Sequence, residues 1–358
     1  MVALLSFLLG LAALVIGAEL LVRGASKLAL TFGISPLVVG LTVVSLGTSA
    51  PEVAVSVQAA MSDQADIAVG NVVGSNILNV LFILGLSALI TPLIIRRQLI
   101  RQEVPIMVGT SLLLAVLAWD GTLSRIDGLI MACLLAAYIA FLIVQSRRQE
   151  KSSDAQSIAE AGSGWNSKLP VQIALIIAGL VLLVFGANWL VQAAVTFAKL
   201  LGVSEMVIGL TIVAVGTSLP EIATSITAAI RGERDIAVGN VVGSNIFNIL
   251  GVLGVSSAVA PSGLSIAPAI LAFDIPVMIA VAIACLPIFF TGNLIARWEG
   301  AVFLALYVGY TVYLAMAAQQ HDALSTYGLV LGTIVLPLCV LTVVVITWRE
   351  WRARHKSR

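Results

Sequence analysis

The chain has 358 residues, of which 60% are hydrophobic and 10% are charged, and its formal net charge is +1. Its mean hydropathy is +1.09, whereas soluble globular domains carry about 25% charged residues. This composition excludes a large soluble domain and predicts a polytopic membrane protein. The first apolar segment has neither a basic start nor a small-residue cleavage site, so we expect a retained span rather than a signal peptide.

Eleven apolar stretches are long enough to cross a bilayer, which takes about 17 to 25 mostly apolar residues in a helix. Residues 147–168, between the fifth and sixth stretches, are polar and rich in Ser, Gly, Glu and Gln, which indicates a solvated linker. The stretch at 104–119 is the shortest. The predicted spans are 3–22, 35–61, 66–90, 104–119, 126–145, 169–197, 204–230, 236–260, 267–290, 298–318 and 326–347.

The basic residues between these spans predict an orientation, because Lys and Arg concentrate in cytoplasmic loops. With the amino terminus outside and the carboxyl terminus in the cytoplasm, only Arg125 and Lys199, of 19 Lys and Arg, lie in outer segments. A miscount of one span near the middle would destroy this bias. The charges therefore support both the orientation and the number of spans.

A long internal repeat determines the expected architecture. Residues 40–85 return 169 positions later as residues 209–254, and 29 of the 46 aligned positions are identical. The copies lie five predicted crossings apart, which is an odd number, so they enter the membrane from opposite sides. Inverted-topology repeats are the plan of many secondary transporters, which bind substrate near the midplane where the repeats meet.

Each copy places one carboxylate inside an apolar segment, directly after a proline: Glu52 follows Pro51, and Glu221 follows Pro220. An ionisable residue at membrane depth is costly and marks an ion or substrate pathway. The proline removes a backbone hydrogen bond and frees carbonyl oxygens, which lipid-embedded helices tolerate only beside other partners or a cavity. The apolar part of neither repeat holds a basic partner, so we expect both glutamates to be functional.

Further oxygen-bearing side chains share faces with these glutamates. Thr48 lies four residues before Glu52, so both occupy one helix face, and the next span adds Asn71, Ser75 and Asn79 at four-residue spacing. An oxygen-only cage with two carboxylates suits calcium, which takes about 6–8 oxygen ligands, and sodium, but neither zinc nor copper. The second copy repeats this arrangement with Thr217, Ser218, Glu221, Asn240, Ser244 and Asn248.

Several of these residues also have plain structural interpretations. Serine and threonine in spans often bond to their own helix or a neighbouring one, and asparagine often joins helices. The glycines of the repeats favour close helix packing. Cys133, Cys285 and Cys339 lie in apolar runs without metal-type spacing and are expected to be small buried hydrophobes.

Other acidic residues near the spans are expected to be structural. Glu19 lies four residues before Arg23, a spacing that favours an ion pair. Glu103 and Asp274 occur near predicted span starts, in EVPIM and DIPVM, and are interpreted as membrane-interface residues.

The paired motifs resemble a known family. GTSAPE with GNVVGSNILN, repeated as GTSLPE with GNVVGSNIFN, resembles the two alpha-repeats of the cation/calcium exchanger superfamily, and most of all its prokaryotic sodium/calcium exchangers. The resemblance covers the first ten spans. It implies an all-α polytopic membrane protein with two inverted-topology five-helix repeats and one extra C-terminal transmembrane helix. The expected segments are a first repeat at 1–146, a cytoplasmic linker at 147–168, a second repeat at 169–320, and the extra helix with a basic tail at 321–358.

The resemblance also implies an activity and a ligand set. It implies a secondary active antiporter that exchanges calcium for sodium by alternating access, with two peripheral helices sliding over a static core. Several relatives, notably the potassium-dependent exchangers, carry Asp where this chain has Asn248, which argues against potassium co-transport. The ion ligands implied by motif position are Glu52, Glu221, Thr48, Ser49, Ser75, Asn79, Thr217, Ser218, Ser244 and Asn248.

Other functions make different demands on the sequence. A proton/calcium antiporter stays open as the alternative, because the cage holds only two carboxylates. An intramembrane hydrolase needs a nucleophile–base pair at membrane depth, and no predicted span holds a suitably placed His or Lys, so we do not expect an enzyme. A passive channel would conduct calcium without a counter-ion, and inverted repeats argue against it. We expect no cofactor, no nucleic acid and no obligate protein partner; the expected partners are calcium, sodium and the lipid of a prokaryotic plasma (inner) membrane.

Overall fold

The fold is described from a computed structural model, which places residues 2–150, 168–200, 214–290, 292–319 and 328. In this part of the chain, eight helices are long and apolar enough to cross a membrane, and a bent helix pair adds a ninth candidate. The prediction of a helical polytopic membrane protein is therefore confirmed. Residues 204–213 of the span predicted at 204–230, and the span predicted at 326–347 except for residue 328, lie outside the described residues.

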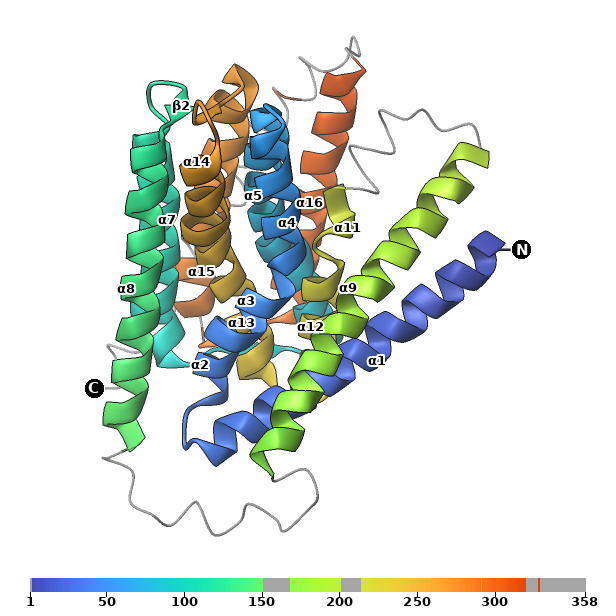
Figure 1. The fold of residues 1–358 in the computed structure, drawn as a ribbon. Helices are drawn as coiled ribbons and strands as arrows, with labels where there is room; N and C mark the ends of the chain where they lie inside the picture. Colours follow the sequence, from blue (N-terminus) through green and yellow to red (C-terminus); the bar gives the residue numbers. More distant parts are fainter. Residues whose placement is uncertain (1, 151–167, 201–213, 291, 320–327, 329–358) are drawn as a thin grey trace.

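The first copy of the repeat and its flanking helices form a continuous run of helical elements joined by short turns (Figure 1). Short π-helical stretches, labelled η, interrupt the α-helices at several points. The elements are α1 (Val2–Thr31), α2 (Pro36–Val39), η1 (Gly40–Val44), α3 (Ser45–Thr48), α4 (Ala50–Met61), α5 (Ala65–Leu78), η2 (Asn79–Leu84), α6 (Gly85–Ile90), β1 (Leu93–Ile94), η3 (Leu99–Glu103), α7 (Val104–Leu117), β2 (Thr122–Leu123) and α8 (Arg125–Glu150).

The second copy repeats this order of elements. Its π-helical stretches η7 and η8 occupy the places of η2 and η3 in the first copy. The described elements are α9 (Leu169–Leu200), α11 (Ala214–Gly216), α12 (Leu219–Ile230), α13 (Arg234–Phe247), η7 (Asn248–Leu253), α14 (Gly254–Val259), β3 (Leu264–Ser265), η8 (Ile270–Asp274), α15 (Ile275–Phe290), β4 (Leu294–Ile295) and α16 (Arg297–Ala318).

Several helices extend beyond the predicted spans. The short stretch at 104–119 belongs to a helical segment that begins at Leu99, because the polar turn of η3 continues directly into α7. Similarly, α8 continues to Glu150, through the first residues of the expected linker. Hydrophobicity locates the part of a helix in lipid, whereas Arg, Gln and Glu are good helix formers that prolong it into water. The segment boundaries proposed from the sequence stay predictions.

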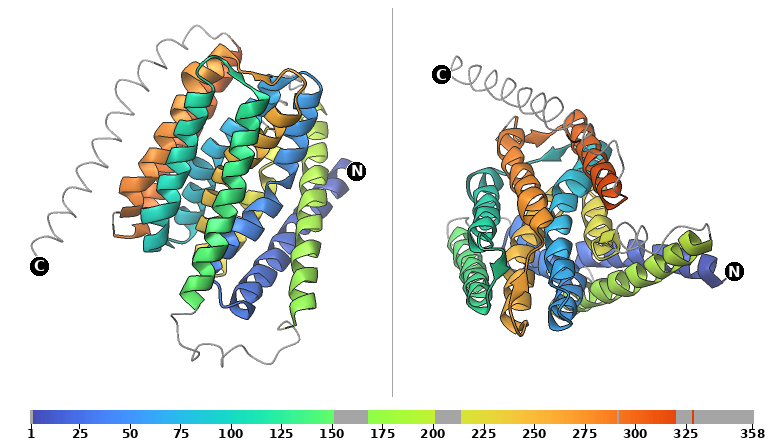
Figure 2. Two further views of the ribbon diagram at one scale, coloured as in Figure 1. Left: turned by 60° about the vertical axis from the view of Figure 1, so that its left-hand side comes forward. Right: turned by 90° about the horizontal axis from the view of Figure 1, so that it is seen from above.

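Helices α1 and α9, which occupy equivalent places in the two copies, lie together at one side of the bundle (Figure 2). A Cβ added at Gly10 would lie 2.9 Å from the carbonyl oxygen of Gly186, and one added at Gly17 would lie 2.8 Å from that of Gly179. Side chains at these positions would push the backbones apart. The later a residue lies along α1, the earlier its contact lies along α9, as Gly10 with Gly186 and Gly17 with Gly179 show. The two helices are therefore antiparallel, as inverted repeats require.

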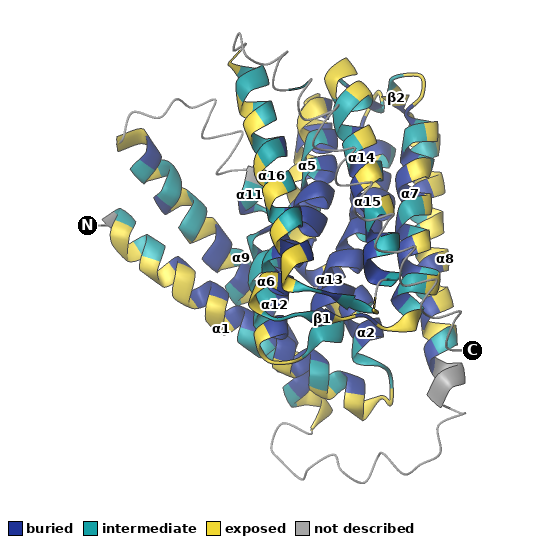
Figure 3. Ribbon diagram, turned by 180° about the vertical axis from the view of Figure 1, so that it is seen from behind, coloured by how far each residue is buried: buried dark blue, intermediate teal, exposed yellow. Residues whose placement is uncertain are grey.

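Two short antiparallel ladders join the copies. Strand β1 pairs with β4, and β2 pairs with β3. By position in the repeats, β1 corresponds to β3 and β2 to β4, so each ladder contains one strand from each copy. The β1 strand and the β2 strand lie at opposite ends of the helix bundle (Figures 1 and 3). This exchange of partners at opposite ends indicates a pseudo-twofold axis in the membrane plane.

The helices that carry the repeated Gly-Ser-Asn motif form the centre of the bundle. The most apolar window of Arg234–Val259 is 94% buried and that of Ala65–Ile90 is 72% buried, whereas that of Arg297–Ala318 is 11% buried. Figure 3 shows α13 buried within the bundle and α16 with an exposed face. The polar motif residues are therefore held at the core, surrounded by apolar helices.

Candidate cation-binding site

Both proline-containing segments are broken helices. Helix α3 ends at Thr48 and α4 begins at Ala50, and the segments on either side of Ser49 are bent by 46°. Ser49 has φ −80° and ψ 7°, and Ser218, its counterpart before α12, has φ −87° and ψ 6°. Pro51 and Pro220 occupy first-turn positions, where the missing N–H has no helical acceptor to lose. The sequence thus begins a new helix inside each span.

The two glutamates occupy the first turns of these inner helices. Glu52 lies in α4 and Glu221 in α12, and each is only 1% exposed. The amino-terminal end of a helix carries partial positive charge and stabilises a carboxylate. Half-helices in transporters use their ends in this way to hold ions. The broken helices therefore offset part of the cost of burying two carboxylates.

Each glutamate accepts a hydrogen bond from the serine of the other copy. The Ser49 hydroxyl donates to Oε1 of Glu221 at 3.0 Å, and the Ser218 hydroxyl donates to Oε1 of Glu52 at 2.9 Å. In both glutamates the second oxygen, Oε2, is buried without a hydrogen-bond partner. The reciprocal bonds tie the two broken helices together and leave one oxygen of each carboxylate available.

A second reciprocal set surrounds the first. The Thr48 hydroxyl donates to Oδ1 of Asn240 at 3.1 Å, and the Thr217 hydroxyl donates to Oδ1 of Asn71 at 3.2 Å. The amide nitrogens of these asparagines donate to serines of their own copies, 2.9–3.0 Å away. These serines are Ser225 for Asn240 and Ser56 for Asn71.

The remaining predicted asparagines also bond across the copies. Asn79 begins η2 and Asn248 begins η7, and π-helical turns often occur at functional sites. The Nδ2 group of Asn79 donates to Asn245, and that of Asn248 donates to Asn76. The Oδ1 atoms of Asn79 and Asn248 are buried without a hydrogen-bond partner. Of each amide group, only the oxygen is therefore free to bind a cation.

The serines of the Gly-Ser-Asn motifs differ between copies. The Ser75 hydroxyl donates to the backbone oxygen of Asn71 at 2.6 Å, four residues earlier on the same helix. The Ser244 hydroxyl is buried and has no hydrogen-bond partner. Sequence reasoning treated the two serines as equivalent, and here the structure distinguishes them.

All ten predicted site residues lie in the described part of the chain, and the structure connects most of them through the bonds above. Buried polar groups without partners are rare in folded proteins, and an ion is one explanation for them. In the part of the chain that the structure describes, no three or more His, Cys, Asp or Glu side chains form a group that could hold a metal ion. Five predicted ligands present an unpartnered buried oxygen, namely Glu52, Glu221, Asn79, Asn248 and Ser244.

Asn76 and Asn245 were missed in the sequence analysis. Both belong to the repeated Gly-Ser-Asn motif, and each lies three residues before a predicted ligand. Residues three apart are neighbours on a helix surface, so this spacing was the available signal. The search for four-residue spacing passed over it.

The other acidic residues lie outside this network. Glu103, which the sequence analysis interprets as a membrane-interface residue, is fully buried against neighbouring helices. It accepts hydrogen bonds from the Tyr138 hydroxyl at 2.7 Å and from the side chains of Gln98 and Gln102. These donors satisfy the buried carboxylate in place of water. The predicted Glu19–Arg23 ion pair is present.

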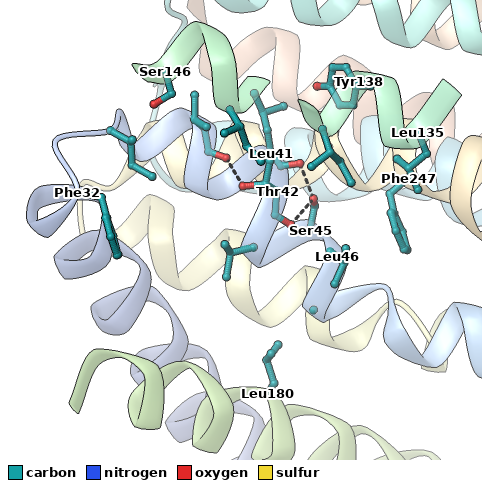
Figure 4. A pocket seen from close by; sticks show the side chains of 17 residues that line it. Phe32, Leu41, Thr42, Ser45, Leu46, Leu135, Tyr138, Ser146, Leu180 and Phe247 are labelled. Carbon is teal, nitrogen blue, oxygen red and sulfur yellow. Dashed lines mark hydrogen bonds between the residues drawn. The ribbon is translucent and has the colours of Figure 1, made fainter. Parts of the chain in front are cut away.

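A cavity of about 560 Å³ opens beside the first copy, between α8, α9 and the segment from Val38 to Gly47. Figure 4 shows two of its polar side chains bonded back to their own helix: Thr42 donates to the Val38 carbonyl and Ser45 to the Leu41 carbonyl. The rest of the lining is mainly apolar, from residues such as Phe247. The Ser45 hydroxyl therefore takes no part in the bonds that join the glutamates.

Comparison with known proteins shows which family the chain belongs to. The family described as sodium/calcium exchanger protein matches residues 2–144 and 171–316. Inner membrane protein YrbG of Escherichia coli is 40% identical over 280 residues, covering 77% of this chain and 85% of that protein. Sodium/calcium exchanger MaX1 of Methanosarcina acetivorans is 38% identical over 343 residues, covering 87% of this chain and 97% of that protein.

The fold is likewise similar to solved structures. The sodium-calcium exchanger NCX_Mj superposes with a TM-score of 0.74 at 33% sequence identity, covering 86% of this chain and 97% of that chain. The chain therefore is a helical membrane protein of the exchanger class. It belongs to the sodium/calcium exchanger family within the cation/calcium exchanger superfamily.

Proposed function

We propose that the chain is a secondary active antiporter that exchanges calcium for sodium, with the ions bound among the oxygens of Glu52, Glu221 and their neighbours. The observation that carries this proposal is the reciprocal bonding of the two glutamates, which leaves an unpartnered oxygen on each. Hard oxygen ligands from carboxylate, amide and hydroxyl groups are those that calcium and sodium prefer. The names of MaX1 and NCX_Mj, which describe those proteins as sodium/calcium exchangers, support calcium and sodium as the two exchanged ions.

Charge explains why such a site exchanges ions rather than releasing them outright. Two carboxylates neutralise one calcium ion, whereas the ion-free site would keep two like charges close together in a medium that screens them poorly. The site therefore refills with sodium ions or protons before the protein reorients. This requirement couples the two ion flows, and it distinguishes an antiporter from a passive channel.

The surroundings of the site support access from alternate sides. Thr48 and Asn240 are buried, whereas their counterparts Thr217 and Asn71 are partly exposed. In the proposed cycle, the closed end and the open end exchange roles while the central ligands stay in place. The antiparallel pair α1 and α9, which lies at the side of the bundle, is the element proposed to move.

We further propose that the amino terminus lies outside and the carboxyl terminus in the cytoplasm of a prokaryotic inner membrane. The distribution of Lys and Arg supports this orientation, and YrbG is named an inner membrane protein. Labelling of single-cysteine variants with a membrane-impermeant reagent tests it: in intact cells, the Ser62→Cys variant should react and the Gly232→Cys variant should not. The reverse pattern would overturn the orientation.

The decisive experiment measures radioactive calcium uptake into proteoliposomes under an outward sodium gradient, a pH gradient, or no gradient. We expect uptake with internal sodium alone, and no uptake by a Glu52→Gln/Glu221→Gln double variant incorporated to the same density. Uptake driven only by the pH gradient would instead establish the proton/calcium antiporter. Uptake without any counter-ion gradient, abolished in the double variant, would indicate a channel.

A further inference from the structure

We propose that Asn76 and Asn245 are positioning residues that hold the amide groups of Asn248 and Asn79 with their oxygens directed to the cation. This inference rests on the proposed function, since it concerns how the same site selects its ligand atoms. It assigns a role to two residues that do not themselves offer a free oxygen.

An asparagine side chain presents a problem to any cation site. Its amide oxygen accepts and its amide nitrogen only donates, yet the two ends have nearly the same size. A rotation of the amide by half a turn would place two N–H groups where a cation needs an oxygen. A site built on Asn79 and Asn248 therefore needs something that fixes their orientation.

The partner of each amide nitrogen supplies this constraint. Nδ2 of Asn248 donates to Oδ1 of Asn76 at 3.1 Å, and Nδ2 of Asn79 donates to Oδ1 of Asn245 at 2.9 Å. All four side chains are at most 3% exposed, so water does not replace a lost partner. If either ligand amide rotated, its oxygen would face another amide oxygen, and its donors would be unpaired.

Asn76 and Asn245 are in turn held by groups that cannot reverse. Nδ2 of Asn76 donates to the backbone oxygen of Asn245 at 3.2 Å, and Nδ2 of Asn245 donates to the backbone oxygen of Asn76 at 3.3 Å. A backbone carbonyl only accepts. Each of these two amides must therefore direct its nitrogen to the opposite backbone and its oxygen to the ligand asparagine.

Two methionine sulfurs complete the set. Nδ2 of Asn76 also lies 3.7 Å from the sulfur of Met278, and Nδ2 of Asn245 lies 3.5 Å from that of Met107. Thioether sulfur is a weak acceptor, so it favours the same orientation. The direction of both ligand oxygens thus follows, step by step, from two backbone carbonyls at the interface of the copies.

A double-substitution experiment separates this role from a general structural one. Asn76→Leu removes the acceptor that orients Asn248 while keeping a side chain of similar size. We expect the calcium KM for sodium-driven uptake to rise about tenfold, with a smaller change in maximal rate, because a competing amide orientation reduces the share of competent sites. The same substitution is then made in an Asn248→Asp background.

The Asn248→Asp background reverses the expectation. A carboxylate has an oxygen at both ends and needs no orientation, and Oδ1 of Asn76 would face it with an unfavourable acceptor–acceptor contact. In this background, Asn76→Leu should leave the calcium KM unchanged or lower it. A purely structural role predicts a similar loss in both backgrounds, and that result would overturn the proposal.

The equivalent substitutions at Asn245 and Asn79 keep the test interpretable if one variant folds poorly. Asn245→Leu, with and without Asn79→Asp, should reproduce the same pattern, and size-exclusion profiles report folding for every variant. Calcium-dependent increases in melting temperature measure binding without transport. If the unsubstituted protein shows no sodium-driven uptake, the proposed exchange fails, but the calcium-induced Tm shift still tests whether Asn76 orients a ligand. If the unsubstituted protein exchanges calcium for sodium and the Asn76→Leu variant has the same calcium KM, only the positioning role is overturned.

Discussion

The two copies of the repeat are nearly the same at the centre of the site and different at its edges. At the centre, each serine of the broken helices bonds to the glutamate of the other copy, and each threonine bonds to an asparagine of the other copy. The surroundings of these bonds differ, because Thr217 and Asn71 are partly exposed where Thr48 and Asn240 are buried, and the Ser75 hydroxyl is bonded where that of Ser244 is not. The symmetric part is the set of bonds between the copies, whereas the exposure of these residues and the bonding of the motif serines are asymmetric, so the predicted ligands belong to both parts.

This contrast separates what ions require from what movement requires. A ligand set that binds the same ions from either side benefits from symmetry, because each copy then contributes equally in both orientations. The parts of the protein that open the site to one side of the membrane and close it to the other must differ between the copies in any one conformation. The proposed exchange needs both properties, and substitutions at paired positions measure how far each extends.

The largest effect is expected at the two glutamates. Glu52→Gln and Glu221→Gln each remove the charge of one ligand, while the amide oxygen can still accept the serine hydrogen bond. Loss of a charged partner costs up to about 3 kcal/mol, which is equivalent to about 100-fold in calcium affinity. Proteoliposome uptake should therefore be abolished in both variants, with expression and folding retained.

Glu52→Gln and Glu221→Gln are expected to have the same effect on calcium uptake. If one variant exchanged calcium normally while the other lost all uptake, the two-carboxylate site would be wrong. The carboxylate whose loss abolishes uptake would then hold the ion alone.

The reciprocal serine bonds should give a smaller but equal pair of effects. Ser49→Ala removes the hydroxyl that donates to Glu221, and Ser218→Ala removes the one that donates to Glu52. A hydrogen bond to a charged group contributes about 1.5 kcal/mol or more, so the calcium KM should change about tenfold in each variant. Paired uptake measurements at varied calcium check this, and a tenfold change at one position with none at the other would contradict the reciprocal arrangement.

The serines of the Gly-Ser-Asn motifs should break the symmetry. The Ser244 hydroxyl is buried without a partner, whereas the Ser75 hydroxyl is occupied by a backbone carbonyl. A free hydroxyl gains more from an ion than one that must first exchange a bond of about 1 kcal/mol. We expect Ser244→Ala to raise the KM for one of the exchanged ions about fivefold, and Ser75→Ala to change it less than about twofold.

Sodium and calcium dependence measured for both serine variants distinguishes which ion uses this oxygen. Equal effects of the two substitutions would show that the asymmetry does not survive ion binding. Ser75 would then rotate to join the site.

The sequence carried enough information to predict most of the helical segments and most of the residues that the structure brings together at the candidate site, for identifiable physical reasons. Apolar length marks a span, a proline before a glutamate marks a break, and a repeat at an odd number of crossings marks inversion. These are local or periodic properties of one chain. The ends of α1 and α8 were predicted too short because hydropathy ends with the lipid while the helix continues.

Contacts between the copies were beyond this reasoning. The bonds of Asn76 to Asn245 and Asn248 join residues about 170 positions apart, at the interface of two segments whose register is set by packing. The burial of Glu103 was also missed, because its partner Tyr138 belongs to another helix. Sequence spacing shows which residues share a helix face, but the partner of that face depends on tertiary structure.

The smallest expected effect concerns one end of α1. Glu19 pairs with Arg231 at the turn between α12 and α13, and Ser26 donates to Glu233 in the same turn. The equivalents of Glu19 and Arg231 in the repeat alignment are Asn188 and Ser62, which carry no charge to form such an ion pair. In the proposed cycle α1 moves relative to this turn, so the ion pair favours the conformation in which it forms.

Arg231→Ala should therefore shift the balance between the two orientations without changing the ligands. The side chains of Arg231 and Glu19 are 37% and 23% exposed, and exposed ion pairs contribute about 0.2–1 kcal/mol. The ratio of calcium KM values at the two membrane faces should then change by no more than about fivefold. Transport from each side of oriented vesicles measures this ratio, with Asn188→Ala as the matched control. Because the pair is exposed, high salt should reduce the difference between Arg231→Ala and the unsubstituted protein, whereas a salt-independent change of KM would point to altered packing of α1 instead.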